Sequence, residues 1–335
     1  MKISASVYSN KSKSPEELVK ELDALGVDYI HIDCNDDASV FEDIAKIKAV
    51  SKTPIDLHII STNPEKYNTL IEQHKVDFVT FQYENIIKHP VQFPKNVKAR
   101  GLSVISETSV DVFEAYKNQC DFILVMTTTP GQSGGAFNKS NFNKIRAFQK
   151  KYPSKKVHVD GGVNDEIAFV LRNYGVDSVV SGSYLVNADT LGTAMHNLRK
   201  TSVNSNLKLG DVVIEKSELP ILNISKASFK DILLAIENYG LGFVMFEDDA
   251  KEFKGICTNA DVRRALIKHY ENISSISISE LVNATPVAMN ENDTISAMLS
   301  KIKSLSFSVL FMPVITSDNK IKGAIMFNNL IKGEL

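Results

Sequence analysis

Short apolar runs that favour β-strands alternate with amphipathic stretches along roughly the first 200 residues of the chain. The apolar runs lie at residues 3–6, 29–33, 55–59, 78–81, 99–104, 122–126, 157–160 and 178–181. Helical patterns lie between most of them, for example at residues 15–25, 64–74, 141–151 and 167–174. Strands that alternate with helices indicate parallel βαβ units, and eight such strands indicate a closed (β/α)8 barrel. The chain is therefore predicted to begin with an α/β domain of the TIM-barrel type.

Four side chains that commonly bind metal ions lie at the carboxyl ends of expected strands, where such barrels carry their catalytic groups. They are His31, Asp33, His58 and Asp160. Residues i and i+2 of a strand point the same way, so His31 and Asp33 share a face. Two imidazoles and two carboxylates suit Zn, Fe, Mn or Co. The pattern predicts a divalent metal site, at which Asp33 and Asp160 can also donate and accept protons. His158 is expected to point away from the neighbours of Asp160 and to be structural.

Glycine-rich segments follow the last three expected strands. The residues concerned are Gly134, Gly135, Gly161, Gly162, Gly182 and Ser183. The loops after strands 7 and 8 are the usual phosphate site of this kind of barrel. Glycine lets backbone amides approach a phosphate closely. A phosphorylated small molecule is therefore the expected substrate class.

Composition excludes several other classes of function. The chain has 335 residues and a net charge of −2, which gives no electrostatic case for nucleic acid. No apolar run approaches the roughly 18 residues that a membrane helix needs. The 3 cysteines are far apart and odd in number, so we expect no disulfide framework and a reducing, cytoplasmic location.

A second domain is predicted after a helix at residues 191–200 and a polar stretch. The first domain is expected to span residues 1–203 and the second residues 208–335, with units at about 208–270 and 276–335. Each unit holds a helix, an apolar strand and a glycine-led segment. The helices are expected from Phe229 and Thr294, and the strands at 243–246 and 309–311. This internal repeat of roughly 60 residues indicates a paired α+β module.

Motifs across residues 1–200 resemble the ribulose-phosphate 3-epimerase family and occur in the family's order. They are Lys2-Ile3 with Ser6, His31-x-Asp33, Asp56-x-His58, Thr80-Phe81 with Glu84, Met126 ahead of Pro130-Gly131, Val159 to Val163, and Ser181-Gly182-Ser183. One motif alone would be a weak signal, whereas the ordered set on a barrel pattern is specific.

The resemblance implies a metal-assisted proton relay. It assigns the metal to His31, Asp33, His58 and Asp160, and it makes the two carboxylates the groups that remove and return the proton beside a ketone. Ser6 would bond a substrate oxygen near the metal, His58 would also face the substrate, and the glycine-rich segments would hold its phosphate. The expected reaction converts D-ribulose 5-phosphate to D-xylulose 5-phosphate.

The chain also departs from that family. Its second-strand motif continues as Asn35-Asp36-Asp37, Gln82 replaces a histidine, and Asn35 and Ile60 replace parts of an apolar shield. These changes leave open a related hexulose phosphate, used in surface-polysaccharide synthesis, as the substrate. Related barrels that decarboxylate or condense sugar phosphates carry Asp-x-Lys at the third strand, whereas His58 here favours an epimerase. A decayed barrel serving as a nucleotide sensor or scaffold is the non-catalytic alternative.

The repeat resembles a tandem pair of CBS (cystathionine-β-synthase-type) domains. The motif runs from Gly255 to Leu266, and the resemblance implies that Thr258 and Asp261 contact an adenine nucleotide. Simple capping of a helix is the alternative role for both. Met326 and Asn329 stand at the matching positions of the second copy, so one competent nucleotide site at most is expected. The resemblance further implies a regulatory role and a homo-oligomer.

Overall fold

The computed structural model describes residues 1–10, 12–88, 90–132, 134–200 and 205–327. These residues form two compact units, one up to residue 200 and one from residue 205. The predicted end of the first domain, at residue 203, and the last eight residues, Asn329 included, lie outside the described residues. No helix in the described part of the chain is long and apolar enough to cross a membrane.

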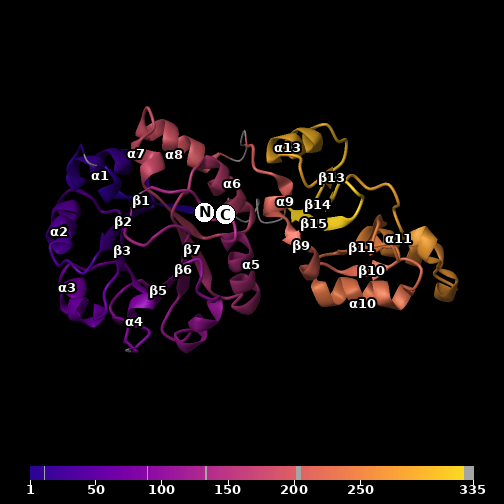
Figure 1. The fold of residues 1–335 in the computed structure, drawn as a ribbon, viewed down its shortest axis with the longest axis horizontal. Coiled ribbons are helices and arrows are strands. Elements are labelled where there is room, and N and C mark those ends of the chain that lie inside the picture. Colours follow the sequence, from indigo (N-terminus) through magenta and orange to yellow (C-terminus); the bar gives the residue numbers. More distant parts are fainter. Residues whose placement is uncertain (11, 89, 133, 201–204, 328–335) are drawn as a thin grey trace. The chain divides into compact units, whose positions relative to one another are not determined.

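The first unit is a closed barrel of parallel strands, as the sequence predicts (Figure 1). Each strand pairs with the next, and the eighth pairs with the first. The strands are β1 (Lys2–Ser6), β2 (Tyr29–Cys34), β3 (Ile55–Ile59), β4 (Phe78–Gln82), β5 (Ala99–Val104), β6 (Phe122–Met126), β7 (Lys156–Asp160) and β8 (Ser178–Ser181).

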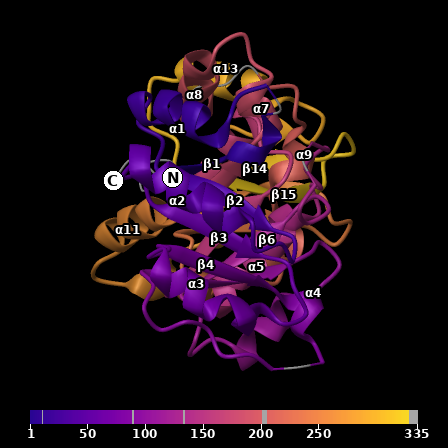
Figure 2. The ribbon, with the colours of Figure 1, turned by 90° about the vertical axis from the view of Figure 1, so that its left-hand side faces the viewer.

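Helices surround this ring, and Figure 2 shows α1, α2 and α3 outside the strands on one side. The helices are α1 (Pro15–Ala24), α2 (Val40–Val50), α3 (Asn68–Gln73), α4 (Tyr83–Ile86), α5 (Asn141–Lys151), α6 (Asp165–Asn173), α7 (Ser183–Val186) and α8 (Leu191–Arg199). The 3₁₀ turns of this unit are η1 (Val7–Ser9), η2 (Pro64–Tyr67) and η3 (Val110–Ala115).

Local sequence signals determine where some of the helices begin: Ser14 and Glu17 form a capping box ahead of α1, and Asn164 caps α6. The predicted helix at 64–74 is divided into the 3₁₀ turn η2 and the short helix α3.

Strand register places polar side chains together in the upper part of the barrel. Neighbouring positions across the parallel strands include Ser6 with His31, His31 with Asp56, and Asp33 with His58. The side chains of Phe122, Leu124 and Met126 on β6 form an apolar cluster. The ring of Phe122 fills the space beside Gly101, where a Cβ would lie 2.2 Å from that ring. The ring of Phe122 therefore fills the barrel interior near the start of β6, whereas polar side chains gather at the carboxyl ends of the strands.

The second unit is an α+β module with a repeated strand pattern. In each half a parallel pair is followed by an antiparallel pair: β10 (Ile221–Asn223), β11 (Phe243–Glu247) and β12 (Phe253–Thr258), then β13 (Met289–Asn290), β14 (Phe311–Ile315) and β15 (Ile321–Met326), with β9 (Ile214–Glu215) beside β15. Its helices are α9 (Leu209–Val212), α10 (Phe229–Tyr239), α11 (Asn259–Lys268), α12 (Ile278–Leu281) and α13 (Ile295–Lys303), with 3₁₀ turns η4 (Lys216–Glu218) and η5 (Ile273–Ser275).

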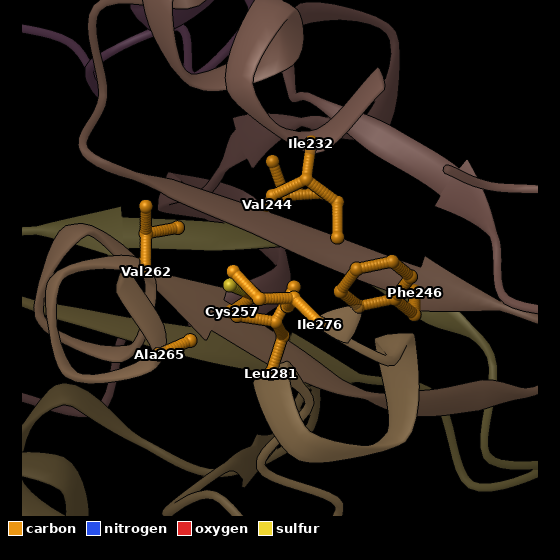
Figure 3. Packing of buried hydrophobic residues seen from close by; sticks show 8 residues of the cluster. All are labelled: Ile232, Val244, Phe246, Cys257, Val262, Ala265, Ile276 and Leu281. Carbon is orange, nitrogen blue, oxygen red and sulfur yellow. The ribbon is translucent and has the colours of Figure 1, made fainter. Parts of the chain in front are cut away.

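A buried apolar cluster holds the first half together (Figure 3). It joins the sheet to its helices through Ile232, Val244, Phe246, Cys257, Val262, Ala265, Ile276 and Leu281. The stacked rings of Phe243 and Phe311, 3.9 Å apart, join the two halves. The predicted strand at 309–311 is wrong, since β14 begins only at Phe311. Pro313 is tolerated within β14 because β13 pairs with Val314 and Ile315 alone.

Candidate metal centre and active site

Four potential metal ligands meet at the carboxyl ends of β2, β3 and β7. They are the four residues that the sequence singles out, His31, Asp33, His58 and Asp160, and one ligand atom from each lies within 4.8 Å of all the others. Both histidines are buried, while 19% of the Asp33 side chain and 16% of the Asp160 side chain remain exposed. Both carboxylates can therefore be reached from the open end of the barrel.

The ring of His31 is held from its outer side. Its Nδ1 lies 3.0 Å from Asp56 Oδ2, and the Ser4 hydroxyl donates to the same oxygen at 2.8 Å. Its Nε2 lies 3.4 Å from Asp33 Oδ1 and 3.6 Å from Asp160 Oδ2, and it is buried without a hydrogen-bond partner among the described residues. An unpaired buried ring nitrogen is costly unless something binds it. A metal ion would fill that role, because metal-binding histidines typically bond a carboxylate through the other nitrogen.

The ring of His58 is held in a comparable way. Its Nδ1 lies 3.1 Å from Asp33 Oδ1, and its Nε2 lies 2.9 Å from Gln82 Oε1. The Gln82 amide nitrogen in turn donates to Glu84. The two imidazoles therefore each direct one nitrogen at the carboxylates and anchor the other. This donor set fits a divalent ion such as Zn, Mn, Fe or Co.

The two exposed carboxyl groups of the cluster have different proton affinities in the metal-free site. Burial raises the pKa of Asp160 to about 6. Burial also acts to raise the pKa of Asp33, but the positive charge of the adjacent His31 outweighs it and holds that pKa well below its usual range. A pair of carboxyl groups with separated pKa values is the arrangement that enzymes use for one proton donor and one acceptor.

The prediction that His158 points away from the neighbours of Asp160 is wrong. The two residues are two positions apart on β7 and so share the interior face. The His158 ring stacks on Phe122 at 4.0 Å below the ligand cluster, and burial lowers its pKa to about 4, which keeps it neutral. Its role remains one of packing.

A cavity that is open to solvent lies beside the carboxylates. The carboxylates of Asp33 and Asp160 line it, and so do predicted substrate contacts on other elements: Ser6, Gly134, Gly161, Gly162, Gly182 and Ser183. Gly135 instead lines an adjoining hollow beside Gly162 and Ser183. His58 is fully buried and does not line the cavity, so its contact with a substrate stays a prediction.

The loop after β7 needs glycine for two reasons. Gly161 and Gly162 have φ values of +108° and +63°, in the region that side chains disfavour. A Cβ on Gly161 would also lie 2.3 Å from Thr128 Oγ1, and one on Gly162 would lie 2.3 Å from the Phe137 nitrogen. The backbone of Gly161 and Gly162, without side chains to cover it, can therefore form part of the cavity wall.

Thr258 and Asp261 form a capping box at the start of α11. The Thr258 amide donates to Asp261 Oδ2 at 2.8 Å, its hydroxyl donates to the same oxygen at 2.5 Å, and Arg264 forms an ion pair with Asp261. Thr258 lines a groove whose other walls include Phe307 and Leu310, whereas Asp261 does not line it. The capping role is thus present, and the nucleotide role stays a prediction for both.

Comparison with known proteins identifies the barrel. The model of the ribulose-phosphate 3 epimerase family matches residues 2–186, more than half of the chain. The chain belongs to the ribulose-phosphate 3-epimerase family. Curated relatives named ribulose-phosphate 3-epimerase include that of Methanocaldococcus jannaschii, 29% identical over 61% of this chain and 92% of the relative. The cytoplasmic isoform of Oryza sativa is 28% identical over 61% and 93% respectively.

The second unit is similar to solved CBS-domain structures. The CBS-pair protein CBSX2 from Arabidopsis thaliana is 15% identical, with a TM-score of 0.33, over 39% of this chain and 95% of that one. CbpB in complex with c-di-AMP is 21% identical, with a TM-score of 0.31, over 38% and 85%. The chain thus joins a barrel of the epimerase family to a paired α+β module.

Two parts of this epimerase-family site were not predicted as site residues. Asp56 and Ser4 support His31, and Gln82 with Glu84 supports His58. The only sequence signal was alternation, since Ser4 precedes Ser6 by two positions and Asp56 precedes His58 by two. Glu84 belongs to the family motif at the fourth strand, and its carboxylate accepts a hydrogen bond from Gln82.

Proposed function

We propose that the barrel is a metal-dependent epimerase that inverts C3 of a ketose phosphate, with D-ribulose 5-phosphate and D-xylulose 5-phosphate as its substrate pair. The observation that carries the proposal is the position of Asp33 and Asp160. Both belong to one cluster of potential metal ligands, and both line the cavity. They come from β2 and β7, which are separated by β1 and β8 around the ring, so they approach a bound substrate from different sides.

His31, Asp33, His58 and Asp160 would hold the metal. When bound, a divalent ion would supply stabilisation of the negative charge that develops on the substrate oxygens. One carboxylate takes the proton from C3, the C–H electron pair becomes the second C2–C3 bond of an enediolate, and the π pair of the C2 carbonyl group moves onto its oxygen. The other carboxyl group returns a proton to C3 from the opposite face. No net oxidation occurs, and the two groups exchange roles when the reaction runs backwards.

The remaining cavity residues would orient the sugar phosphate. Ser6, at the end of β1, lies beside the carboxylates and would bond a substrate oxygen, while the bare backbone of Gly161 and Gly162 would face the phosphate. Burial of the histidines excludes water from the inner side of the cluster.

A hexulose phosphate is the second candidate substrate. Asn35 and Thr128 give the cavity polar side chains, and Gly131 leaves room for Asn35, because a Cβ on that glycine would lie 2.2 Å from Asn35 Oδ1. Such a wall could bond the additional hydroxyl group of a six-carbon substrate.

Proton exchange tests the reaction and the substrate together. The metal-loaded protein is incubated in D2O with pentulose and hexulose phosphates side by side, and the C3 proton is followed by NMR. We expect deuterium to enter C3 of D-ribulose 5-phosphate as D-xylulose 5-phosphate appears. Faster exchange of a hexulose phosphate would select the second candidate. Inactivity toward every ketose phosphate, by protein with a stoichiometric metal, would refute the epimerase proposal.

We further propose that residues 208–335 form a regulatory module that binds an adenine nucleotide. The support is the motif around Thr258 and the groove that this residue lines between the two halves. The predicted homo-oligomer and the predicted cytoplasmic location remain predictions. Exposed Ile267 and Tyr270, at 72% and 83%, are apolar side chains that a second copy would cover.

Replacement of Asp261 by alanine is expected to weaken binding of AMP several-fold, measured by calorimetry on the full chain. The change also breaks the capping box of α11, which costs about 1 kcal/mol at most. Asp231→Ala is the matched control, because Asp231 forms the same capping box with Ser228 at the start of α10. If both variants lose AMP to the same extent, or neither does, Asp261 has no specific part in nucleotide binding.

A further inference from the structure

The two ring nitrogens of His58 face different partners. Nδ1 faces Asp33 Oδ1 at 3.1 Å, inside the ligand cluster, and Nε2 faces Gln82 Oε1 at 2.9 Å, outside it. The ring is fully buried. A neutral imidazole has one N–H donor and one bare acceptor nitrogen, and its partners decide which nitrogen is which. The nature of the Gln82 contact therefore determines what His58 presents to the cluster.

Glu84 fixes the orientation of the Gln82 amide. The Gln82 nitrogen donates to Glu84 Oε2. The other carboxylate oxygen of Glu84 accepts from the Ile105 amide at 3.2 Å and from the Thr108 hydroxyl at 2.5 Å. An ionised carboxylate can only accept, so the nitrogen of Gln82 must face Glu84. Its oxygen is then left facing His58.

The orientation of Gln82 determines the tautomer of His58. An amide oxygen can only accept, so Nε2 of His58 must carry the hydrogen and donate it to Gln82. Nδ1 is left bare, and it faces another acceptor, Asp33 Oδ1, with no proton between them. Two acceptors at this distance repel each other unless a cation lies against both. The hydrogen bonds of Gln82 with Glu84 and with His58 thus leave the lone pair of His58 Nδ1 directed into the ligand cluster.

His31 has the same arrangement, with the nitrogens exchanged. Its Nδ1 faces Asp56, and its Nε2 faces Asp33 and Asp160. The partner of His31 is an ionisable carboxyl group, whereas the partner of His58 is a neutral amide backed by a carboxylate. The residue at position 82 must therefore accept a hydrogen bond from His58 Nε2. A second contact must also hold its side chain in the orientation that presents the acceptor.

We propose that Gln82, held by Glu84, is a positioning residue that fixes the Nε2–H tautomer of His58 and so makes Nδ1 a metal ligand. The inference rests on the proposed metal centre. It assigns a function to a chain of hydrogen bonds that begins in the loop after β5, passes through Glu84 and Gln82, and ends at His58. It implies that loss of the Gln82 oxygen weakens metal binding without removing any ligand.

The test compares metal affinity in three full-length proteins: the unchanged chain, Gln82→Met and Thr80→Val. Methionine keeps the length of glutamine but neither accepts strongly nor donates. Thr80 is the control, because it is a fully buried neighbour on β4, pairs in register with His58, and has no hydrogen-bond partner for its hydroxyl among the described residues. Affinity for Co²⁺ is measured by competition with a chelator, and the cobalt absorption bands report the ligand field.

We expect Gln82→Met to bind Co²⁺ about 10- to 100-fold more weakly, with shifted absorption bands, while Thr80→Val binds as the unchanged chain does. A second measurement needs no variant: ¹⁵N NMR of histidine-labelled, zinc-loaded protein should show His58 protonated at Nε2. Unaltered cobalt binding by Gln82→Met, or a proton on Nδ1, would overturn the inference. Failure of the unchanged chain to bind any divalent metal would instead refute the proposed metal centre.

Discussion

Asp160→Asn should lose epimerisation by about 10³-fold or more while still exchanging the C3 proton of one epimer with solvent. A positioned acid or base typically contributes about 10²- to 10⁴-fold, and asparagine keeps the shape of aspartate without a titratable proton. The remaining carboxylate, Asp33, can still remove a proton from the face that it reaches and return a solvent deuteron to the same face. Asp33→Asn should behave in the same way toward the opposite epimer.

The measurement is NMR in D2O, started separately from each pure epimer at saturating metal. The metal content of each protein is determined in parallel, because both residues are also potential ligands. Complementary exchange by the two variants would establish two carboxylates on opposite faces of the substrate. Exchange of both epimers by a single variant would show that one group serves both faces.

Asp56→Asn is the matched control, because it removes the same negative charge as Asp33→Asn or Asp160→Asn. Asp56 is buried beside His31 and does not line the cavity. Its loss should slow turnover by loosening His31, but the two epimers should still exchange to similar extents. If Asp56→Asn also exchanged the proton of only one epimer, exchange limited to one epimer would not identify the carboxylate that faces the substrate.

The barrel could be predicted because each of its strands is a buried apolar run between turn residues. β3 and β6 occupy the predicted residues, since nothing inside either run contradicts strand structure. The candidate ligands stood out for the same reason: a His or Asp that ends such a run lies where the barrel opens. In the second unit Pro313 interrupts the apolar run, and the predicted strand was placed too early.

The partners of the ligands could not be predicted, because they depend on the register between strands. The Ser4 hydroxyl meets Asp56 from a position 52 residues away, and His31 meets Asp56 across 25 residues. Alternation indicates a face of a strand, not the neighbour across it. Gln82 looked like a departure from the family motif, yet it bonds His58 directly. At Thr258 a local signal was ambiguous, since the spacing that suggests nucleotide binding also forms a capping box.

Removal of the metal should abolish turnover and destabilise the barrel, and both effects should reverse on adding Zn, Mn or Co. Without a cation, the carboxyl groups of Asp33, Asp56 and Asp160 surround two imidazoles. A ligand that binds only the folded state stabilises it by about 2.7 kcal/mol at a concentration of about 100 times its Kd. The midpoint of thermal unfolding of the full chain, with and without metal, measures this difference.

The stabilising effect of the metal should grow as the pH rises from about 5 to 8. Burial acts to lower the pKa of His31, but the carboxylates of Asp33 and Asp56 outweigh it and raise that pKa well above its ordinary value. Burial also raises the pKa of Asp160 to about 6. Both groups bind protons more tightly in the metal-free fold than in the unfolded chain, so the stability that they contribute is lost as pH rises through their folded pKa values. The bound metal replaces those protons, so it stabilises the fold most at high pH, where the protons have dissociated. A gap between the two unfolding midpoints that did not change with pH would mean that the metal does not bind at this cluster.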